Sequence, residues 1–260
     1  MNKIKSLYYH NPAADGFQKM IAYYKRRGYR FISVEELKHM LLAHKPIAEK
    51  LIFVSFDDGW RGNLKLLPII EKYEIPICIF VATEPLLDGN FWWEYVYKTL
   101  GQKGVERYKQ MPYIDFSDNL LQIKDLVSLS RSALTEDEIK MLSHHPLVSI
   151  QSHTVTHPIL TNVTQLQLEK ELSDSKVIIE RLIGKEVFAF SYPNGSLSNR
   201  ETEMCKRYYS MAFTTEQNNI SIKDDIYALP RYALTGSFAR DLLKVWGIWK
   251  YLRRIKDSLL

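Results

Sequence analysis

The sequence predicts an α/β fold built around a parallel sheet or barrel. Apolar, strand-like runs alternate with segments of helical periodicity over the first third of the chain, as expected when helices connect parallel strands. The run Leu51–Phe56 is almost wholly apolar, which is typical of a strand buried on both faces. The length of 260 residues suits one large domain, because single α/β barrels have about 250 residues.

The first part of the predicted fold is regular. Gly28 ends one helix, and a capping box of Ser33 and Glu36 starts the next. Pro68 falls early in a third helix, where it is tolerated or bends the chain. We expect strands at residues 6–9, 29–32, 51–56 and 76–82, and helices at residues 17–27, 33–43 and 63–73.

The later part of the chain is less regular. Residues 84–133 are polar and weakly periodic, and we interpret them as an insertion with short helices, the first at residues 91–100. Residues 1–260 are expected to form one domain that ends in an amphipathic helix at about residues 238–256. Between the insertion and this helix we expect helices at residues 134–144, 164–183 and 200–208, and strands at residues 147–151, 187–191, 211–214 and 226–229.

Composition excludes some classes of function. The net charge of +5 lacks the clustered basic surface of a nucleic-acid-binding protein, except near the C-terminus. No apolar run approaches the ~20 residues that span a bilayer, and residues 1–15 lack a signal-peptide core, so we expect a cytoplasmic protein. Cys78 lies in an apolar run, far in the sequence from Cys205, which favours a free buried thiol over a disulfide.

Two adjacent carboxylates, Asp57 and Asp58, follow the central strand Leu51–Phe56 and precede Gly59. In α/β folds, ligands and catalytic groups gather at the carboxyl ends of strands. Neighbouring side chains in a strand face opposite ways, but Gly59 can relax the backbone so that both acids enter one pocket. The alternative is a simple Asp-Gly turn with an incidental acid.

His153 and His157 lie four residues apart, just after a predicted strand. On a helical turn, side chains at this spacing share a face, so both imidazoles can bind one ion. With Asp58 they would form a three-ligand site that leaves positions open for water and substrate, as catalytic metal sites do. The alternative for a histidine is a structural role, and we interpret the adjacent His144 and His145 as surface residues.

Hydrolysis at such a site also needs a base and an acid. Asp57 is well placed as the base, because it neighbours the expected ligand Asp58. His10, after the first predicted strand, is the remaining candidate for the acid, since His39 and His44 fall in or just after a helix. The alternative for His10 is a hydrogen-bonded surface residue.

Two of these motifs together resemble a known family. Residues 56–59 read FDDG and residues 153–157 read HTVTH, and in this order they are similar to the motifs of the polysaccharide deacetylases, the NodB-like domain of carbohydrate esterase family four. The resemblance spans about Leu7 to Leu234. It implies a distorted (β/α) barrel that removes acetyl groups from N-acetyl sugars or from O-acetyl esters. It also implies that Asp57 is the general base and that the metal ligands are Asp58, His153 and His157.

Residues 6–11, SLYYHN, and residues 17–37 resemble one branch of this family, the poly-N-acetylglucosamine deacetylases. In that branch the acid precedes FDDG, as in a permuted barrel, which assigns the acid to His10. A third motif, SYPNG at residues 191–195, lacks the arginine that many members place there. We expect Arg231 to replace that arginine as the partner of the base, and the alternative is a surface ion pair.

Substrate contacts are expected from two regions. The third motif would supply a backbone N–H near Asn194 for the oxyanion, although this asparagine replaces the tyrosine of the branch. The aromatic residues at 91–95 form either a wall on which a sugar stacks or the buried face of a helix. The candidate contact residues are Tyr192, Pro193, Asn194, Trp60 and Trp92.

The C-terminal helix carries Trp246, Trp249 and Leu252 beside several basic residues. A basic amphipathic helix with tryptophan can lie on an anionic membrane, whereas most amphipathic helices dock on their own domain. Contact with the inner leaflet would make a lipid-linked or nucleotide-linked sugar a suitable substrate.

We therefore expect a metal-dependent hydrolase that removes N-acetyl groups from a saccharide. Zn²⁺ suits two histidines and an aspartate, and Co²⁺, Ni²⁺, Fe²⁺ or Mn²⁺ could occupy the same ligands. The alternatives are a carbohydrate O-acetyl esterase and a carbohydrate-binding protein that has lost activity.

Overall fold

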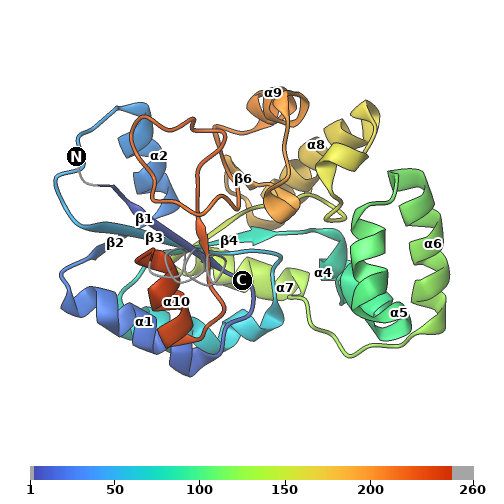
Figure 1. The fold of residues 1–260 in the computed structure, drawn as a ribbon, viewed down its shortest axis with the longest axis horizontal. Coiled ribbons are helices and arrows are strands. Elements are labelled where there is room, and N and C mark those ends of the chain that lie inside the picture. Colours follow the sequence, from blue (N-terminus) through green and yellow to red (C-terminus); the bar gives the residue numbers. More distant parts are fainter. Residues whose placement is uncertain (1–2, 248–260) are drawn as a thin grey trace, which may run out of the picture.

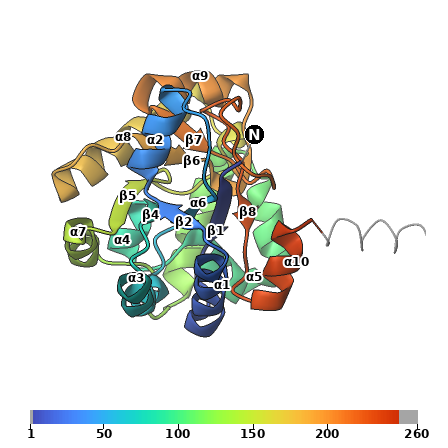
Figure 2. The same ribbon diagram turned by 90° about the vertical axis from the view of Figure 1, so that its left-hand side faces the viewer.

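A computed structural model describes residues 3–247 of the chain. Its centre is a parallel sheet with the strand order β7-β6-β5-β4-β3-β1-β8, and β2 also pairs with β3. The sheet curls into an open half-barrel with helices around it (Figures 1 and 2), which confirms the predicted distorted α/β barrel. The strands are β1 (Lys5–Tyr9), β2 (Arg30–Ile32), β3 (Leu51–Phe56), β4 (Ile77–Val81), β5 (Val148–Ser152), β6 (Ala189–Ser191), β7 (Met211–Phe213) and β8 (Tyr232–Ala233).

Strand β3 lies at the point where the barrel is distorted. It pairs with β1 from Ile52 to Phe56. Its other edge is shared by two strands, because β2 pairs with Leu51–Phe53 and β4 pairs only with Ser55 and Phe56. All six residues of β3 are buried. The segment that follows β3 therefore emerges near the middle of the sheet, between the ends of β1 and β4.

Alternate residues of the strands face the interior of the half-barrel. Phe53 of β3 and Phe80 of β4 both pack on Phe213 of β7, with ring centroids 5.2 and 5.3 Å apart. Contact between strands so far apart in the sheet shows that the sheet closes around these rings. Continuing this alternation from Phe53 through Ser55 directs Asp57 into the interior.

Helices cover the outside of the sheet with their apolar faces, and several start at side-chain caps, among them the predicted cap Ser33. Ser33 and Thr135 accept hydrogen bonds from the backbone three residues later. The helices outside the insertion are α1 (Ala14–Arg26), α2 (Val34–Leu42), α3 (Leu67–Tyr73), α7 (Glu136–His144), α8 (Gln165–Ile183), α9 (Asn199–Tyr208) and α10 (Phe238–Val245).

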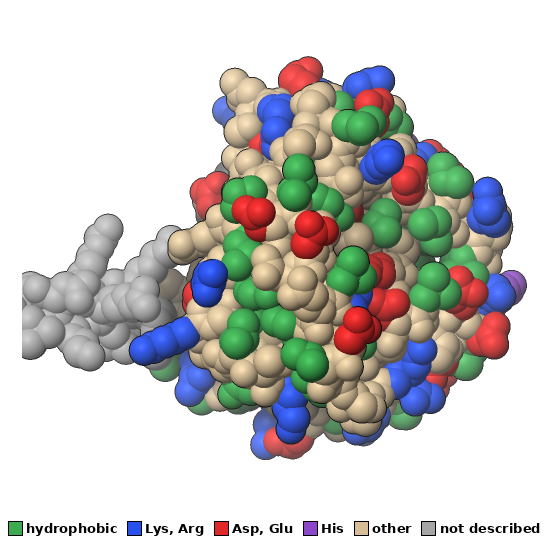
Figure 3. All heavy atoms as spheres, turned by 90° about the vertical axis from the view of Figure 1, so that its right-hand side faces the viewer, with side chains coloured by type: hydrophobic (Ala, Val, Ile, Leu, Met, Phe, Trp, Pro, Cys, Tyr) green, Lys and Arg blue, Asp and Glu red, His purple; other side chains and the backbone are tan. Residues whose placement is uncertain are grey.

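The segment interpreted as an insertion contains α4 (Glu84–Asp88), α5 (Trp92–Lys109) and α6 (Tyr113–Leu126). Helices α5 and α6 form a hairpin beside the half-barrel (Figure 1), with an aromatic and aliphatic core of its own. Gly101 interrupts α5 with a φ of 65°. On the outer side of this part of the molecule, apolar, acidic and basic side chains are interspersed (Figure 3).

Two local predictions are wrong or need adjustment. Residues 226–229 form turns rather than a strand, because Asp225 accepts hydrogen bonds from Tyr227 and Ala228, and only Leu229 makes an isolated bridge. The strand in this region is β8, which begins after Arg231. The helix expected at residues 63–73 is divided, with a 3₁₀ turn at Arg61–Leu66 ahead of α3, since Pro68 has no N–H to donate.

The predicted C-terminal helix is described only in part. Helix α10 ends at Val245, and residues 248–256 of the predicted helix, with Trp249 and Leu252, lie outside the described residues. Within the described part, Trp246 is 44% exposed and lies near the cations of Lys5 and Arg27. None of the helices in residues 3–247 combines the length and the apolar character needed to cross a membrane.

Candidate active site

The carboxyl ends of β1, β3 and β5 bring the predicted residues to one cavity. His10 follows β1, Asp57 and Asp58 follow β3, and His153 follows β5. The cavity has a volume of about 830 Å³, and these residues line it together with His157. Asp58 has a φ of 75°, and this left-handed backbone turns its carboxylate toward the same side as that of Asp57.

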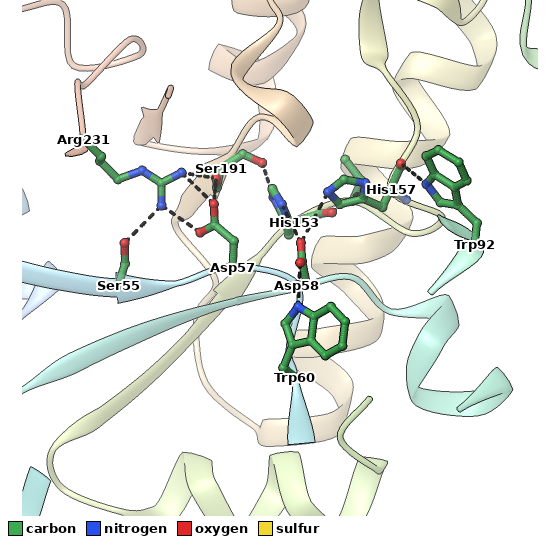
Figure 4. A network of polar contacts seen from close by, with 10 residues as sticks. Ser55, Asp57, Asp58, Trp60, Trp92, His153, His157, Ser191 and Arg231 are labelled. Carbon is green, nitrogen blue, oxygen red and sulfur yellow. Dashed lines mark hydrogen bonds and ion pairs between the residues drawn. The ribbon is translucent and has the colours of Figure 1, made fainter. Parts of the chain in front are cut away.

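Asp58, His153 and His157 form a compact cluster (Figure 4). The Oδ1 of Asp58 lies 3.4 Å from the Nε2 of each histidine, and the three ligand atoms lie within 4.8 Å of one another. This Oδ1 is buried and accepts no hydrogen bond. An unsatisfied buried carboxylate oxygen facing two imidazole nitrogens suits a cation that would contact all three.

The two histidines converge through a strained loop rather than the helical turn that their spacing suggested. Residues 153–159 contain no helix, and both Thr154 and His157 have positive φ angles, of 74° and 57°. The hydroxyl of Thr154 accepts a hydrogen bond from the backbone N–H of His157 at 3.0 Å. The predicted pairing is therefore present, but its structural explanation was wrong.

Glu171 of α8 holds this loop in place through hydrogen bonds. Its carboxylate accepts hydrogen bonds from the backbone N–H of Val155 and of Thr156, at 2.8 and 3.0 Å, and from the Thr156 hydroxyl at 2.8 Å. Burial raises the pKa of Glu171, although these hydrogen bonds oppose the shift. The sequence reasoning missed this residue, because nothing in a helix pattern distinguishes an inward glutamate whose partners come from another loop.

The surroundings shift the pKa values of the two histidines in opposite directions. Burial lowers the pKa of His157 to about 3, and the neighbouring His153 contributes to the shift, so His157 is neutral at pH 7. Burial opposes protonation of His153 too, but Asp58 and Asp57 outweigh it and raise its pKa. The Nδ1 of His153 donates to the carbonyl of Ser191 at 2.7 Å, which leaves Nε2 facing Asp58.

Aromatic side chains support the cluster. The indole N–H of Trp60 donates to Oδ2 of Asp58 at 2.8 Å, and that of Trp92 donates to the carbonyl of His157 at 3.0 Å. Trp93 packs against the ring of His157, with centroids 4.7 Å apart. Trp60 and Trp92, predicted to contact substrate, both line the cavity, but Trp92 is only 5% exposed and belongs mainly to the core of the hairpin.

Arg231 and Asp57 form a buried, bidentate ion pair. Nη1 donates to Oδ1 at 2.7 Å and Nη2 donates to Oδ2 at 2.9 Å. The remaining N–H groups of Arg231 donate to Ser55, Ser191 and the carbonyl of Thr214. Burial alone would raise the pKa of Asp57, but Arg231, with His153, holds it below the ordinary range, so Asp57 is ionised.

Arg231 reaches Asp57 from an unexpected direction. We expected it at the end of a strand, but it precedes β8, and its side chain passes through the half-barrel interior over the ring of Tyr8, 4.3 Å from the ring centroid. It is fully buried, which excludes the alternative of a surface ion pair. Sequence analysis missed its partners Ser55 and Ser191, which only the closure of the barrel brings together.

His10 lines the same cavity as Asn194 of the third motif. It is exposed, and its ring packs edge-on against Tyr8 at 5.5 Å. Tyr8 lines the cavity and was not predicted, although strand alternation with His10 could have indicated it. Burial, with the charges of Asp57 and Asp58, raises the pKa of Tyr8 to about 12, and Arg231 partly opposes the shift.

The third motif contributes less to the cavity than expected. Asn194 lines it, with a φ of 58°. The side chain of Tyr192 is fully buried in the main core, beside Phe190, and Pro193 is also buried; neither lines the cavity. The prediction that Tyr192 and Pro193 contact substrate is therefore corrected, since the alternation along β6 directs the tyrosine outward into the helix layer.

Comparison with known proteins agrees with this arrangement. The family profile described as polysaccharide deacetylase matches residues 44–212, about two thirds of the chain. The chain belongs to the polysaccharide deacetylase family. This confirms the resemblance on which the sequence analysis relied.

Two relatives that match this chain come from Bacillus subtilis and Staphylococcus aureus. A putative polysaccharide deacetylase YxkH of B. subtilis is 25% identical, over 83% of this chain and 62% of the relative. A poly-beta-1,6-N-acetyl-D-glucosamine N-deacetylase of S. aureus is 19% identical, over 88% of this chain and 70% of the relative. The chain thus spans less than two thirds of the first of these proteins.

Two solved structures share the fold. The Streptococcus pyogenes deacetylase PplD, in complex with acetate, is 21% identical with a TM-score of 0.71, covering 94% of this chain and 98% of that one. IcaB from Ammonifex degensii is 17% identical with a TM-score of 0.69, covering 94% of this chain and 97% of that one. At identities of 21% and 17%, the similarity to these two structures shows that the chain shares their fold.

Proposed function

We propose that this polysaccharide deacetylase is a metal-dependent hydrolase that removes N-acetyl groups from a glycan. The observation that carries the proposal is the cluster of Asp58, His153 and His157, whose ligand atoms lie within 4.8 Å of one another beside the ionised Asp57. His10 lines the same cavity and is a suitable proton donor.

The three ligands suit a divalent cation. Two imidazoles and one carboxylate are a three-ligand set that leaves positions open. The buried Oδ1 of Asp58, without a hydrogen bond, is an acceptor that a cation would satisfy. When bound, the ion supplies Lewis-acid activation of the acetyl carbonyl and of water. We propose Zn²⁺, with Co²⁺, Ni²⁺, Fe²⁺ and Mn²⁺ as ions that the same ligands accept.

Asp57, His10 and Asn194 then divide the proton transfers and charge stabilisation. Asp57 accepts the proton of the attacking water, and Arg231 keeps this carboxylate ionised and oriented between turnovers. His10, as an imidazolium, protonates the departing nitrogen from its exposed position on the cavity rim. A backbone N–H near Asn194 donates to the oxyanion.

The presence of His10 favours amide over ester hydrolysis. An amine is a poor leaving group until it is protonated, whereas an alkoxide from an O-acetyl ester needs less help. We therefore place N-acetyl sugars ahead of O-acetyl sugars as substrates. The relative in S. aureus is named as a poly-beta-1,6-N-acetyl-D-glucosamine N-deacetylase, which supports this order.

One experiment tests the function directly. Purified protein loaded with Zn²⁺ is assayed for acetate release from N-acetylated and O-acetylated oligosaccharides, and its metal content is measured in parallel. We expect release from the N-acetyl substrates and one ion per chain. Asp57→Asn should lower kcat by about 10³-fold or more while leaving metal content nearly unchanged. Full activity in Asp57→Asn would remove the base assignment.

We also propose that the protein is cytoplasmic. A second proposal is that its C-terminal segment contacts a membrane. Trp246 with neighbouring basic side chains suits an anionic surface, on which a lipid-linked sugar would be presented. Flotation with vesicles containing anionic lipid tests the contact. Equal flotation of the whole chain and of a variant ending at residue 237 would contradict it.

A further inference from the structure

We propose that Tyr8 is a positioning residue, whose ring holds the imidazole of His10 at a fixed place beside the buried guanidinium of Arg231. This inference rests on the proposed function, because it concerns how the acid of that reaction is oriented. It assigns a role to a residue that the proton transfers themselves do not use.

The imidazole of His10 has no polar support. The side chain is exposed, and none of the residues in the described range 3–247 makes a hydrogen bond or an ion pair with its ring. A catalytic imidazole is usually oriented by a third group, most often through a hydrogen bond to one ring nitrogen. The orientation of this proton donor must therefore come from packing.

The ring that packs against His10 belongs to Tyr8. The two residues lie two positions apart at the end of β1, a spacing that directs side chains to the same face. Their ring centroids are 5.5 Å apart with an interplanar angle of 66°, which is the favourable edge-on arrangement. Both residues line the cavity. Because His10 makes no other ring contact within the described part of the chain, Tyr8 is the group that limits its movement.

Tyr8 itself is held rigidly. It is 5% exposed, and its backbone pairs with Ser55 of β3 on one side and with Ala233 of β8 on the other. The guanidinium carbon of Arg231 lies 4.3 Å from the centroid of its ring, within the range of a cation–π contact. The guanidinium is fixed in turn by its bidentate ion pair with Asp57. The tyrosine ring thus has little freedom, so it can hold the imidazole beside it in place.

These contacts join the acid and the base of the proposed reaction. The backbone N–H of Asp57 donates to the carbonyl of Tyr9 at 2.9 Å, so the segments that carry the two groups are joined at their backbones. Their side chains are joined through Arg231 and Tyr8, because the tyrosine ring contacts both the guanidinium and the imidazole. A displacement of about 1 Å in a reacting group can lower a rate by roughly 10²-fold, so this spacing bears directly on kcat.

The test compares variants that keep and remove the ring. Tyr8→Phe keeps both ring contacts, and the hydroxyl that it deletes makes no hydrogen bond with the residues that the structure describes. Tyr8→Leu removes both contacts. With Zn²⁺-loaded protein and N-acetylated oligosaccharides, we expect Tyr8→Leu to lower kcat for acetate release by about tenfold or more with little change in KM. Tyr8→Phe should retain most of the wild-type kcat.

Phe80→Leu is the matched control. Phe80 is fully buried, and its ring centroid lies 5.4 Å from the guanidinium carbon of Arg231, but it does not line the cavity. Its replacement therefore removes an aromatic contact of Arg231 without removing one of His10, and it should lower kcat less than Tyr8→Leu. If Tyr8→Leu does not fold, Tyr8→Met replaces it, because the flexible methionine side chain fills irregular space without a ring.

Two further measurements separate positioning from a general structural effect. In a His10→Ala background, Tyr8→Leu should cause no further loss of kcat, because the residue that it positions is gone. Nuclear magnetic resonance of protein labelled at histidine needs no substrate. The ring-proton resonances of His10 should shift in Tyr8→Leu and stay near their wild-type positions in Tyr8→Phe.

The outcomes distinguish this inference from the proposed function. Full kcat in Tyr8→Leu, an equal loss in Tyr8→Phe or Phe80→Leu, or a loss that persists in the His10→Ala background would overturn the positioning role and leave the hydrolase in place. Unshifted His10 resonances in Tyr8→Leu would overturn the ring contact. Absence of acetate release from every substrate by the wild type would overturn the proposed function, and the positioning of its acid with it.

Discussion

At the scale of single residues, the site depends on charges that are buried but paired. Asp57 is 2% exposed and Arg231 is fully buried, and every N–H of the guanidinium has an acceptor. A buried ion pair adds little to the free energy of unfolding compared with apolar residues of similar volume. Removal of one partner lowers this free energy strongly, because the other charge is then buried without compensation. The pair therefore sets the ionisation and orientation of Asp57 more than it stabilises the fold.

Replacement of Arg231 tests this interpretation. Arg231→Met leaves Asp57 buried and uncompensated, so we expect a loss of about 3–5 kcal/mol in the free energy of unfolding. Arg231→Lys keeps the charge but loses the bidentate contact, and it should retain more stability than the Met variant while losing activity. Urea unfolding and acetate release measure the two effects. Equal stability of the Met and Lys variants would show that charge on this side chain is unimportant.

The same pair predicts a dependence of stability on pH. The pKa of Asp57 in the folded protein lies below its ordinary value of 3.8, so the unfolded chain binds a proton at higher pH than the folded one. The stabilisation from ionised Asp57 is therefore complete above pH 3.8 and is lost as the pH falls through the lower, folded pKa. The difference in unfolding free energy between wild type and Asp57→Asn should therefore be constant from pH 7 to about pH 4 and should shrink as the pH falls below 3.8. An undiminished difference below pH 3.8 would contradict the assignment.

At the scale of elements, the loop that carries His153 and His157 is held by helix α8. The carboxylate of Glu171 in α8 accepts hydrogen bonds from the backbone N–H groups of residues 155 and 156, and the Thr154 hydroxyl accepts one from the N–H of His157. The loop contains two non-glycine residues with positive φ, a conformation that persists only when its surroundings enforce it. The geometry of the histidines thus depends on a helix that begins some ten residues later.

Glu171→Gln should therefore weaken metal binding without touching the ion. A glutamine places an N–H₂ group among donors, so the loop loses acceptors and relaxes, and we expect zinc affinity to fall by about 10–100-fold. Competition with a chromophoric chelator gives the affinity. Asp174→Asn, an exposed acid on the same helix, is the control. A lower melting temperature with unchanged zinc affinity would assign Glu171 a purely structural role.

At the scale of the whole molecule, the half-barrel joins parts of the chain that are far apart in sequence. Asp58 and the two histidines of the cluster are separated by almost a hundred residues, and Arg231 lies still farther along. The divided edge of β3 and the curl of the sheet bring their strand ends to one rim. An ion at this rim would cross-link the central strand β3 to β5.

Zinc should consequently stabilise the fold as a whole. A ligand that binds only the folded state at a hundred times its Kd adds about 2.7 kcal/mol to the free energy of unfolding. We expect thermal unfolding of chelator-treated protein to shift upward on addition of Zn²⁺, and His153→Ala to abolish the shift. An unchanged melting temperature in wild-type protein would argue against a site shared by these strands.

The sequence by itself determined the alternation of strands and helices and the motifs that carry the chemistry. It predicted Asp57, Asp58, His10 and the two histidines, because strand periodicity and ligand spacing are local properties. It also predicted the helix cap at Ser33, which depends on a residue three positions later.

Only the tertiary structure decided how those groups meet. The route of Arg231 through the interior, the burial of Tyr192 and the cavity wall supplied by α5 depend on which faces pack together after the sheet curls. The period-two alternation of a strand predicts that neighbouring side chains face opposite sides of the sheet. It does not predict which side becomes the interior of the half-barrel. That choice follows from long-range burial, and with it comes the extent of the cavity.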